Sequence, residues 1–239
     1  MTNFRKIILF LLSLPLFLSL TLVDVESTLH KNFPFSDGEK ITYAIKKMGV
    51  KTGESSLVFR GLTRINTKNA YLIIFTASSL NFFDEEKIYI DTKTFYPLVV
   101  NRDLNIWGKK EKIFEEYFPE KGLVKITKYA GGKKITEQTI EKKGTLDNIY
   151  SFIYRYRNQG QFKVGDTLLM NLPTKDVVLK LKEITKIKAA GQQFDAYYMK
   201  SDPAQYEVWF DASDKKIPLK INGAVGFGDT AMVMMAYHR

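Results

Sequence analysis

The sequence has no cysteine, only two histidines and, beyond its first 27 residues, no apolar run long enough to cross a membrane as a helix. Without cysteine there is no disulfide, thiolate metal site or cysteine nucleophile. The histidines, His30 and His238, lie near opposite ends of the chain, so we expect no histidine-based metal site. Esterase elbows, glycine-rich phosphate loops and His-Glu-x-x-His are also missing. The sequence therefore predicts no enzyme, no cofactor and no metal.

The first residues form a basic head followed by an apolar run. Arg5 and Lys6 precede residues 7–23, which are mostly apolar but contain Pro15. This pattern is typical of a secretory signal peptide, here residues 1–27 with cleavage after Ser27. No cysteine follows the run, which excludes an acylated N-terminus. We expect an exported, periplasmic protein. The alternative is an uncleaved segment that anchors the protein to the inner membrane.

The formal net charge is +10. In an exported protein this charge favours anionic envelope partners, such as lipid head groups, lipopolysaccharide phosphates or lipidated proteins. Nucleic acid fits that compartment poorly and is not expected. A second interpretation is that lysines spread along the strands only keep a β-sheet surface soluble.

Residues 28–239 read as a series of strands in a single β-rich domain. Ile41, Tyr43 and Ile45 alternate with more polar residues, which is the period of a half-buried strand. Gly131-Gly132 lies between two such segments and predicts a tight hairpin. The predicted fold is therefore all-β, with antiparallel strands in a long meander.

One segment, residues 146–158, has a helical period instead. Thr145 is expected to cap its start, Asp147 and Arg157 lie where the helix dipole favours their charges, and Gly160 is expected to end it. Its apolar face consists of Leu146, Ile149, Tyr150, Ile153 and Tyr154.

The two sides of this helix resemble each other. Ile88-Tyr89-Ile90-Asp91 followed by Pro97-Leu98 matches Val208-Trp209-Phe210-Asp211 followed by Pro218-Leu219, and further pairs keep the same order. We predict two repeat units, 38–117 and 165–237, around a hairpin-helix insert, 118–160. The halves are expected to curl into one curved open barrel or to face each other as a sheet pair, with the helix packed on them. The two aspartates are interpreted as turn residues.

Aromatic and acidic side chains supply the only candidates for a site. Trp209 is predicted to lie on the polar face of its strand, and Tyr89 holds the matching place in the first unit. With Tyr150 and Tyr154 of the helix, these residues form the predicted ligand-binding set. The acidic clusters Asp84-Glu85-Glu86 and Glu115-Glu116 are interpreted as solvated charge.

Several of these motifs together resemble a family of exported bacterial proteins that is catalogued as a domain of unknown function. The resemblance covers nearly all of residues 36–239 and implies a fold and a compartment rather than an activity. The Asp–turn–Pro-Leu link is also similar to one in periplasmic lipoprotein-sorting carriers, which are open β-barrels that shuttle lipidated cargo. The residues that carry the family resemblance are Gly38-Glu39-Lys40-Ile41-Thr42-Tyr43, Gly49…Gly53-Glu54, Asp147…Ser151…Tyr154…Arg157 and Val208-Trp209…Pro218-Leu219.

Two functions remain open on these grounds. The first is a periplasmic binding or carrier protein for a hydrophobic or amphipathic anionic ligand, with the sheet as a cup and the helix as a lid. It predicts an apolar cavity of several hundred Å³ between them. The second is a structural envelope protein that pairs with other envelope proteins through exposed strand edges.

Overall fold

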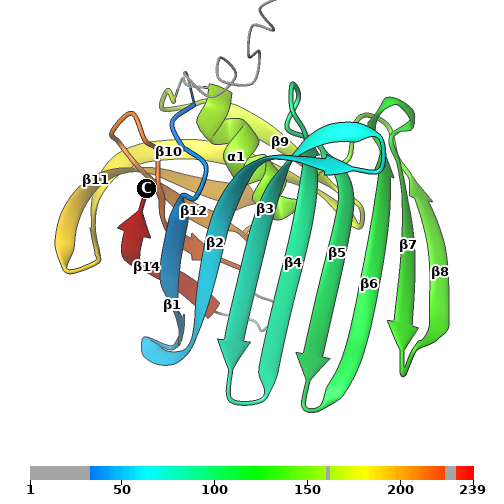
Figure 1. Cartoon of the computed structure of the whole chain (residues 1–239). Coiled ribbons are helices and arrows are strands. Elements are labelled where there is room, and N and C mark those ends of the chain that lie inside the picture. The colour runs from blue at the N-terminus through cyan, green and yellow to red at the C-terminus, as the bar shows by residue number, and fades with distance from the viewer. Residues whose placement is uncertain (1–32, 160–161, 224–229) are drawn as a thin grey trace, which may run out of the picture. The chain divides into compact units, whose positions relative to one another are not determined.

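The computed structural model describes residues 33–159, 162–223 and 230–239, and residues 33–239 form one compact unit. The predicted signal peptide and Gly160 lie outside the described residues. Within the described part, the protein consists of fourteen antiparallel strands, one α-helix and a short 3₁₀ turn, Pro119–Lys121 (Figure 1). The elements are β1 (Lys40–Lys47), β2 (Val50–Ile65), β3 (Lys68–Ser79), β4 (Phe82–Asp91), β5 (Pro97–Ile106), β6 (Lys109–Phe118), β7 (Leu123–Ala130), β8 (Lys133–Glu141), α1 (Ile149–Gln159), β9 (Thr167–Leu172), β10 (Lys175–Ala189), β11 (Gln192–Asp202), β12 (Glu207–Asp211), β13 (Pro218–Asn222) and β14 (Thr230–His238).

All fourteen strands belong to one sheet. Its order is β8-β7-β6-β5-β4-β3-β2-β1-β14-β13-β12-β11-β10-β9, so each meander keeps its sequence order and β1 joins the two by pairing with β14. The outer strands β8 and β9 do not pair with each other, and the described sheet is open. The predicted all-β antiparallel meander is confirmed, and it forms a single open sheet rather than a pair of separate sheets.

The strands are distributed evenly over the predicted units. Strands β1 to β6 fall in the first unit, β9 to β14 in the second, and β7, β8 and α1 in the insert between them. The aspartates at the matching links both serve as turn residues, as predicted. Asp91 accepts hydrogen bonds from the backbone N–H groups of Lys93 (3.0 Å) and Thr94 (2.8 Å), and Asp211 accepts one from Ser213 (3.0 Å).

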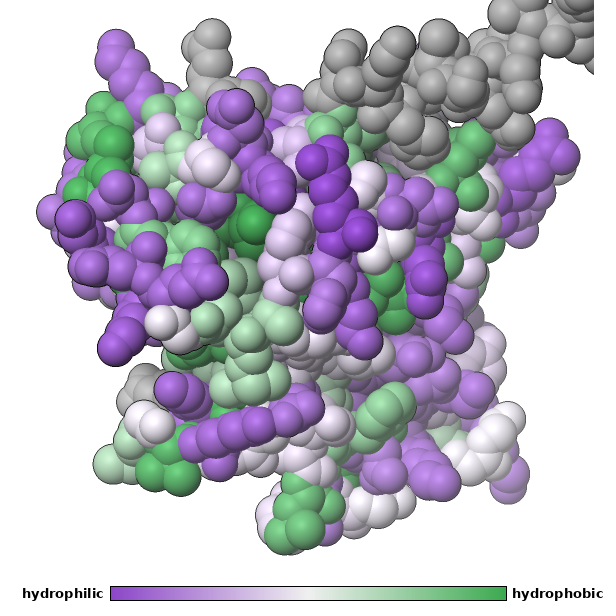
Figure 2. Space-filling model, turned by 60° about the vertical axis from the view of Figure 1, so that its left-hand side comes forward, coloured by the Kyte–Doolittle hydropathy of each residue, from purple (hydrophilic) through white to green (hydrophobic). Residues whose placement is uncertain are grey.

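Local sequence patterns explain the strands and their turns. On β1, Ile41, Tyr43 and Ile45 are buried, as their alternation predicted. Gly131 and Gly132 have φ angles of 57° and 76°, which glycine adopts without steric cost, and they form the predicted turn between β7 and β8. The surface in Figure 2 is mostly hydrophilic with hydrophobic residues interspersed, as expected where lysines occupy outward positions.

The helix begins three residues later than predicted. Asn148, not Thr145, caps it: the side-chain carbonyl of Asn148 accepts hydrogen bonds from the N–H groups of Tyr150 (2.9 Å) and Ser151 (3.3 Å). Thr145 instead donates its hydroxyl to the carbonyl of Pro119 at 3.5 Å. The prediction was wrong because the apolar spacing continues through Leu146, which is buried without being helical.

The helix packs against both halves of the sheet. Tyr150 stacks on Phe75 of β3, with ring centroids 4.1 Å apart, and Tyr156 contacts Phe210 of β12 at 5.6 Å. These contacts join residues of both meanders in one hydrophobic core. Of the described residues, no helical segment combines the length and hydropathy that crossing a bilayer demands.

Candidate functional site

The helix tyrosines lie in packed core. Tyr154 is fully buried, packs edge-on against Phe35 (4.9 Å) and donates its hydroxyl to Glu39 (3.4 Å). Tyr150 is buried against Phe75 and borders a cleft at the start of α1. The apolar gap left between α1 and β9 to β13 measures only about 20 Å³. The large apolar cavity expected under the helix is therefore not found among the described residues.

Trp209 and Tyr89 lie on the opposite face of the sheet from the helix. Their strand neighbours, such as Val208 and Ile88, point into the core, so the two rings point outward and are half-buried. Trp209 stacks on Tyr198 of the adjacent strand, with centroids 4.7 Å apart, and the ammonium group of Lys220 lies 4.4 Å from its centroid. The structure therefore separates this pair from the helix tyrosines.

A fully buried ion pair fastens the helix to the two joining strands. Arg157 donates to both carboxylate oxygens of Glu39, at 2.6 and 2.9 Å, and neither side chain is exposed. Tyr237 of β14 donates to the same carboxylate (3.2 Å), and Arg157 also donates to the carbonyl of Lys215 (3.0 Å). Because neither Arg157 nor Glu39 is exposed to solvent, we interpret this ion pair as structural.

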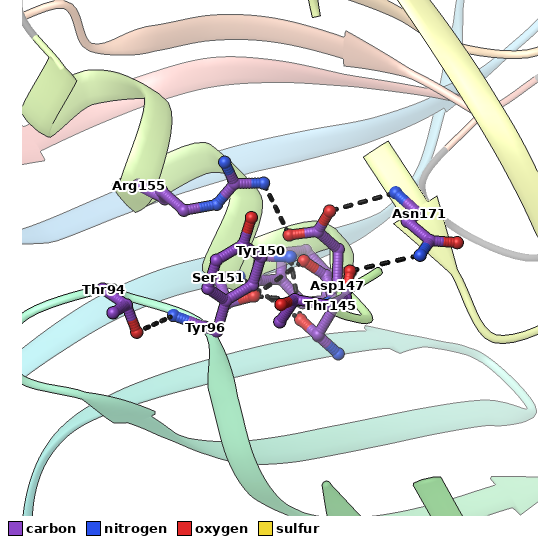
Figure 3. Close-up of polar contacts among 9 residues, drawn as sticks. Thr94, Tyr96, Thr145, Asp147, Tyr150, Ser151, Arg155 and Asn171 are labelled. Atoms are coloured by element: carbon purple, nitrogen blue, oxygen red, sulfur yellow. Dashed lines mark hydrogen bonds and ion pairs between the residues drawn. The ribbon is translucent and has the colours of Figure 1, made fainter. Parts of the chain in front are cut away.

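The start of α1 is held by a second network (Figure 3). Asp147 accepts a hydrogen bond from Arg155 at 2.6 Å and another from the backbone N–H of Asn171 at 3.0 Å. The side-chain amide of Asn171 in turn donates a hydrogen bond to the carbonyl of Thr145 at 3.2 Å. These bonds fix the chain before the helix against β9.

A cleft of about 390 Å³ opens beside this network, and it corrects one sequence interpretation. Asp84 and Glu86 are not solvated charges, since both are buried on β4. Arg102 of β5 donates to both oxygens of Asp84, at 2.8 and 2.6 Å, and lies 3.4 Å from Glu86. Burial raises the pKa of Glu86 to about 7, although the Arg102 charge opposes the shift.

A second open site lies at the other end of the strands. It is a mostly apolar groove of about 340 Å³ between three hairpin turns, β1–β2, β3–β4 and β5–β6. Trp107 donates its backbone N–H to the carbonyl of Asn81 at 2.8 Å, which ties two of these turns together. The groove is lined by Ile45, Lys47, Thr52, Ser79, Leu80, Asn81, Phe82, Trp107 and Thr230.

The turns beside the groove expose large apolar side chains. Leu80 is 96% exposed, Met48 90% and Trp107 74%. We call the three turns (45–53, 78–83 and 105–110) the tip surface. Met48 and Trp107 have positive φ angles, 50° and 53°, where asparagine or glycine is usual. Sequence reasoning missed these residues, although an apolar residue directly before a turn glycine, as in Met48-Gly49 and Trp107-Gly108, is a visible signal.

Within the described residues, no group of histidine and carboxylate side chains is arranged to hold a metal ion. Besides the acidic cleft at the start of α1 and the apolar groove, the described residues form two other open pockets, of about 790 and 330 Å³, which are lined mainly by polar and charged residues. Only the groove offers a largely apolar lining to a ligand, since the cleft contains several charged side chains.

Comparison with known proteins places the chain in a family. Residues 40–236 match the family described as a protein of unknown function (DUF3108). No curated protein matches the chain. Among solved structures it is similar to a beta-barrel-like protein of domain of unknown function DUF1849 from Brucella abortus, with 8% identity, a TM-score of 0.48, and coverage of 85% of this chain and 96% of that one. Because the family match includes nearly the whole sheet, the chain belongs to the DUF3108 family.

Proposed function

We propose that this protein is a non-catalytic binding or carrier protein for an amphipathic anionic ligand of the lipid class. The observation that carries the proposal is the groove of about 340 Å³, which combines apolar walls with a lysine at its rim. A groove of this volume is within the range of small-ligand sites. Phe82 and Trp107 supply apolar surface, and Lys47 supplies a positive charge.

The apolar walls suit an acyl chain. Burying each methylene of such a chain contributes roughly 0.8 kcal/mol, so a chain segment of a few carbons can provide useful affinity. Ile45 and Phe82 come from adjacent hairpins and present their side chains to the same space. The groove thus takes the place of the expected cavity under the helix.

The charges at the rim suit an anionic head group. Lys47, Lys109 and Lys110 are exposed at the ends of β1 and β6, beside the groove. An ammonium group near an anion gives an attraction that salt weakens, as expected for exposed charges. The basic head and apolar run of residues 1–27 support the proposal that the protein acts in the periplasm.

Trp107 provides a direct test. The chain has two tryptophans, so Trp209→Phe leaves Trp107 as the only one. We expect its fluorescence to shift to shorter wavelength when lysophosphatidylglycerol is added below its micellar concentration, and to shift less with lysophosphatidylcholine. An unchanged spectrum with both lipids would contradict the proposal.

A matched pair of variants locates the binding. Ser79→Phe places a ring in the groove, whereas Ser78→Phe places one on the opposite face of β3. The first variant is expected to abolish the spectral shift and the second to retain it. Equal responses from both variants would show that the groove is not the binding site.

One observation favours the second candidate, a structural protein that pairs through strand edges. Strand β8 pairs only with β7 in the described sheet, and nearly all of its side chains are exposed. A photo-crosslinking residue at Ile135 or Gln138 should then capture an envelope protein in the intact cell. Absence of any crosslinked adduct would argue against this function.

A further inference from the structure

Three hairpin turns of the tip surface present their apolar residues at the same end of the sheet. Figure 1 shows the turns β1–β2, β3–β4 and β5–β6 together at its lower end. The groove residues Lys47, Leu80 and Trp107 come one from each turn, which confirms that the turns are neighbours. The space-filling view is turned about the vertical axis, and hydrophobic residues are visible at its lower end (Figure 2).

The tip surface also carries charge of one sign only. Its three segments, 45–53, 78–83 and 105–110, contain no aspartate or glutamate. They contain five lysines: Lys46, Lys47, Lys51, Lys109 and Lys110. Of these, Lys51 is paired with Glu54 just outside the segment, at the end of the turn. The other four lysines lie in the two turns that carry Met48 and Trp107, and these segments contain no acidic residue.

The turns at the opposite end of the sheet have a different character. In the β4–β5 turn, Asp91 accepts the turn's hydrogen bonds and the apolar Phe95 is buried in the core. The β6–β7 turn contains Glu120 and no exposed large apolar side chain. Exposed apolar residues together with lysines therefore distinguish the tip surface from these two turns.

We infer that the tip surface docks on an anionic lipid bilayer. Met48, Leu80 and Trp107 enter the interfacial region, where tryptophan is favoured because its ring is apolar and its N–H is polar. The lysines contact the anionic head groups, which attract positive side chains near the membrane surface. This arrangement explains why exposed apolar residues occupy positive-φ turn positions that asparagine or glycine would fill at less cost.

Docking goes beyond the proposed ligand binding and does not require it. A bilayer contact at Met48 lies outside the groove, because Met48 is not among the groove residues. Docking would, however, bring the groove close to the lipid surface from which a ligand could enter.

The test uses the full chain with Trp209→Phe, so that Trp107 alone reports. Vesicles of phosphatidylglycerol and phosphatidylcholine with brominated acyl chains are added. We expect the bromines to quench Trp107, with weaker quenching in pure phosphatidylcholine or at high salt. This readout is specific to the tip surface even if residues 1–27 insert into the bilayer. A Trp107 emission that brominated vesicles of either composition leave unchanged would overturn the inference.

Two matched comparisons identify the contributing residues. Met48→Ser with Leu80→Ser should reduce quenching several-fold, whereas Ile184→Ser with Val164→Ser, which removes exposed apolar residues elsewhere, should not. The lysine comparison changes the same charge at two places. Lys47→Gln, Lys109→Gln and Lys110→Gln should weaken binding to anionic vesicles, whereas Lys182→Gln, Lys186→Gln and Lys188→Gln on β10 should not. Equal effects within each pair would refute docking by the tip surface.

The Ser79→Phe variant separates this inference from the proposed function. If it abolishes the response to lysolipid but retains vesicle quenching, docking stands without groove binding. If Met48→Ser abolishes vesicle quenching but retains the lysolipid response, groove binding and docking are distinct and both hold. If neither the parent protein nor any variant responds to lysolipid, the proposed ligand binding fails. Docking is then judged by the vesicle quenching alone.

Discussion

Arg157 of α1 donates to both carboxylate oxygens of Glu39 at the start of the sheet, and neither side chain is exposed to solvent. The two residues are 118 positions apart in the sequence. A buried guanidinium depends on its partner, because removing one member leaves the other charge without compensation. This pair therefore determines whether α1 stays attached to the strands that join the two meanders.

Removal of the Glu39 carboxylate should destabilise the protein strongly. We expect Glu39→Ala to lower the free energy of unfolding by about 3 to 5 kcal/mol, which is typical when one partner of a buried ion pair is lost. Urea denaturation followed by circular dichroism measures this change. As a control, Glu137→Ala breaks the exposed pair with Lys134 and should have little effect. Similar losses in both variants would show that burial of the first pair is unimportant.

The pH dependence of stability should contain a contribution from Glu86. Its pKa is raised from 4.5 to about 7 by burial, so the folded protein holds a proton that the unfolded chain has released between these values. Stability therefore falls as pH rises from about 4.5 to 7, by up to about 3 kcal/mol from this group. Glu86→Gln should reduce the fall by this contribution and be more stable than the parent at pH 8.

The comparison needs a control because other carboxyls also titrate. Burial raises the pKa of Glu115 and of Asp147 in the same direction. Glu85→Gln changes the neighbouring residue, which points to the other face of β4 and pairs with Lys87. Its pH profile should match that of the parent. A Glu86→Gln profile that also matched the parent would contradict the assignment.

The helix cap gives a third prediction. Asn148→Ala removes the carbonyl that accepts two backbone N–H groups at the start of α1, and should cost about 1 kcal/mol of stability. Thr145→Ala removes only a long hydrogen bond to Pro119 and should cost less. Thermal unfolding of the two variants distinguishes the caps. A larger loss of stability from Thr145→Ala than from Asn148→Ala would indicate that Thr145 caps the helix, as the sequence predicted.

The tip surface should show a trade between stability and docking. Met48→Asn places a residue that tolerates a positive φ angle where methionine is strained and 90% exposed. We expect stability to rise by a few tenths of a kcal/mol, about the scale of favourable surface substitutions, while quenching of Trp107 by brominated anionic vesicles declines. Chemical denaturation gives the first quantity. Unchanged quenching together with greater stability would mean that Met48 does not contact lipid.

Local sequence patterns predicted the structural features that depend on residues close together in the sequence. The alternation of Ile41, Tyr43 and Ile45 predicted the buried face of β1, and Gly131-Gly132 predicted the β7–β8 hairpin. Helical spacing predicted α1, but not its first residue, because apolar periodicity does not distinguish a packed approach segment from the helix itself.

Contacts that depend on how distant strands pair could not be predicted from the sequence. Asp84 and Glu86 share a face of β4 with the core, and they are compensated by Arg102, which is 18 residues from Asp84 but lies on the adjacent strand. The tip surface is a similar case, since the turns that carry Met48, Leu80 and Trp107 become neighbours only when three hairpins align. Trp209 was correctly assigned to the face opposite Val208, but its partner Tyr198 comes from another strand.

The pairing of β1 with β14 has a consequence for the folding of the protein. Lys40 of β1 pairs with His238 of β14, so one edge of β1 is completed only when β14 is in place. During folding β2 can cover one edge of β1 at once, whereas the other edge stays open until β14 docks on it. An open strand edge is a site of mispairing, and closing so long a loop is slow. The folding chain is therefore most vulnerable to mispairing before β14 docks on β1.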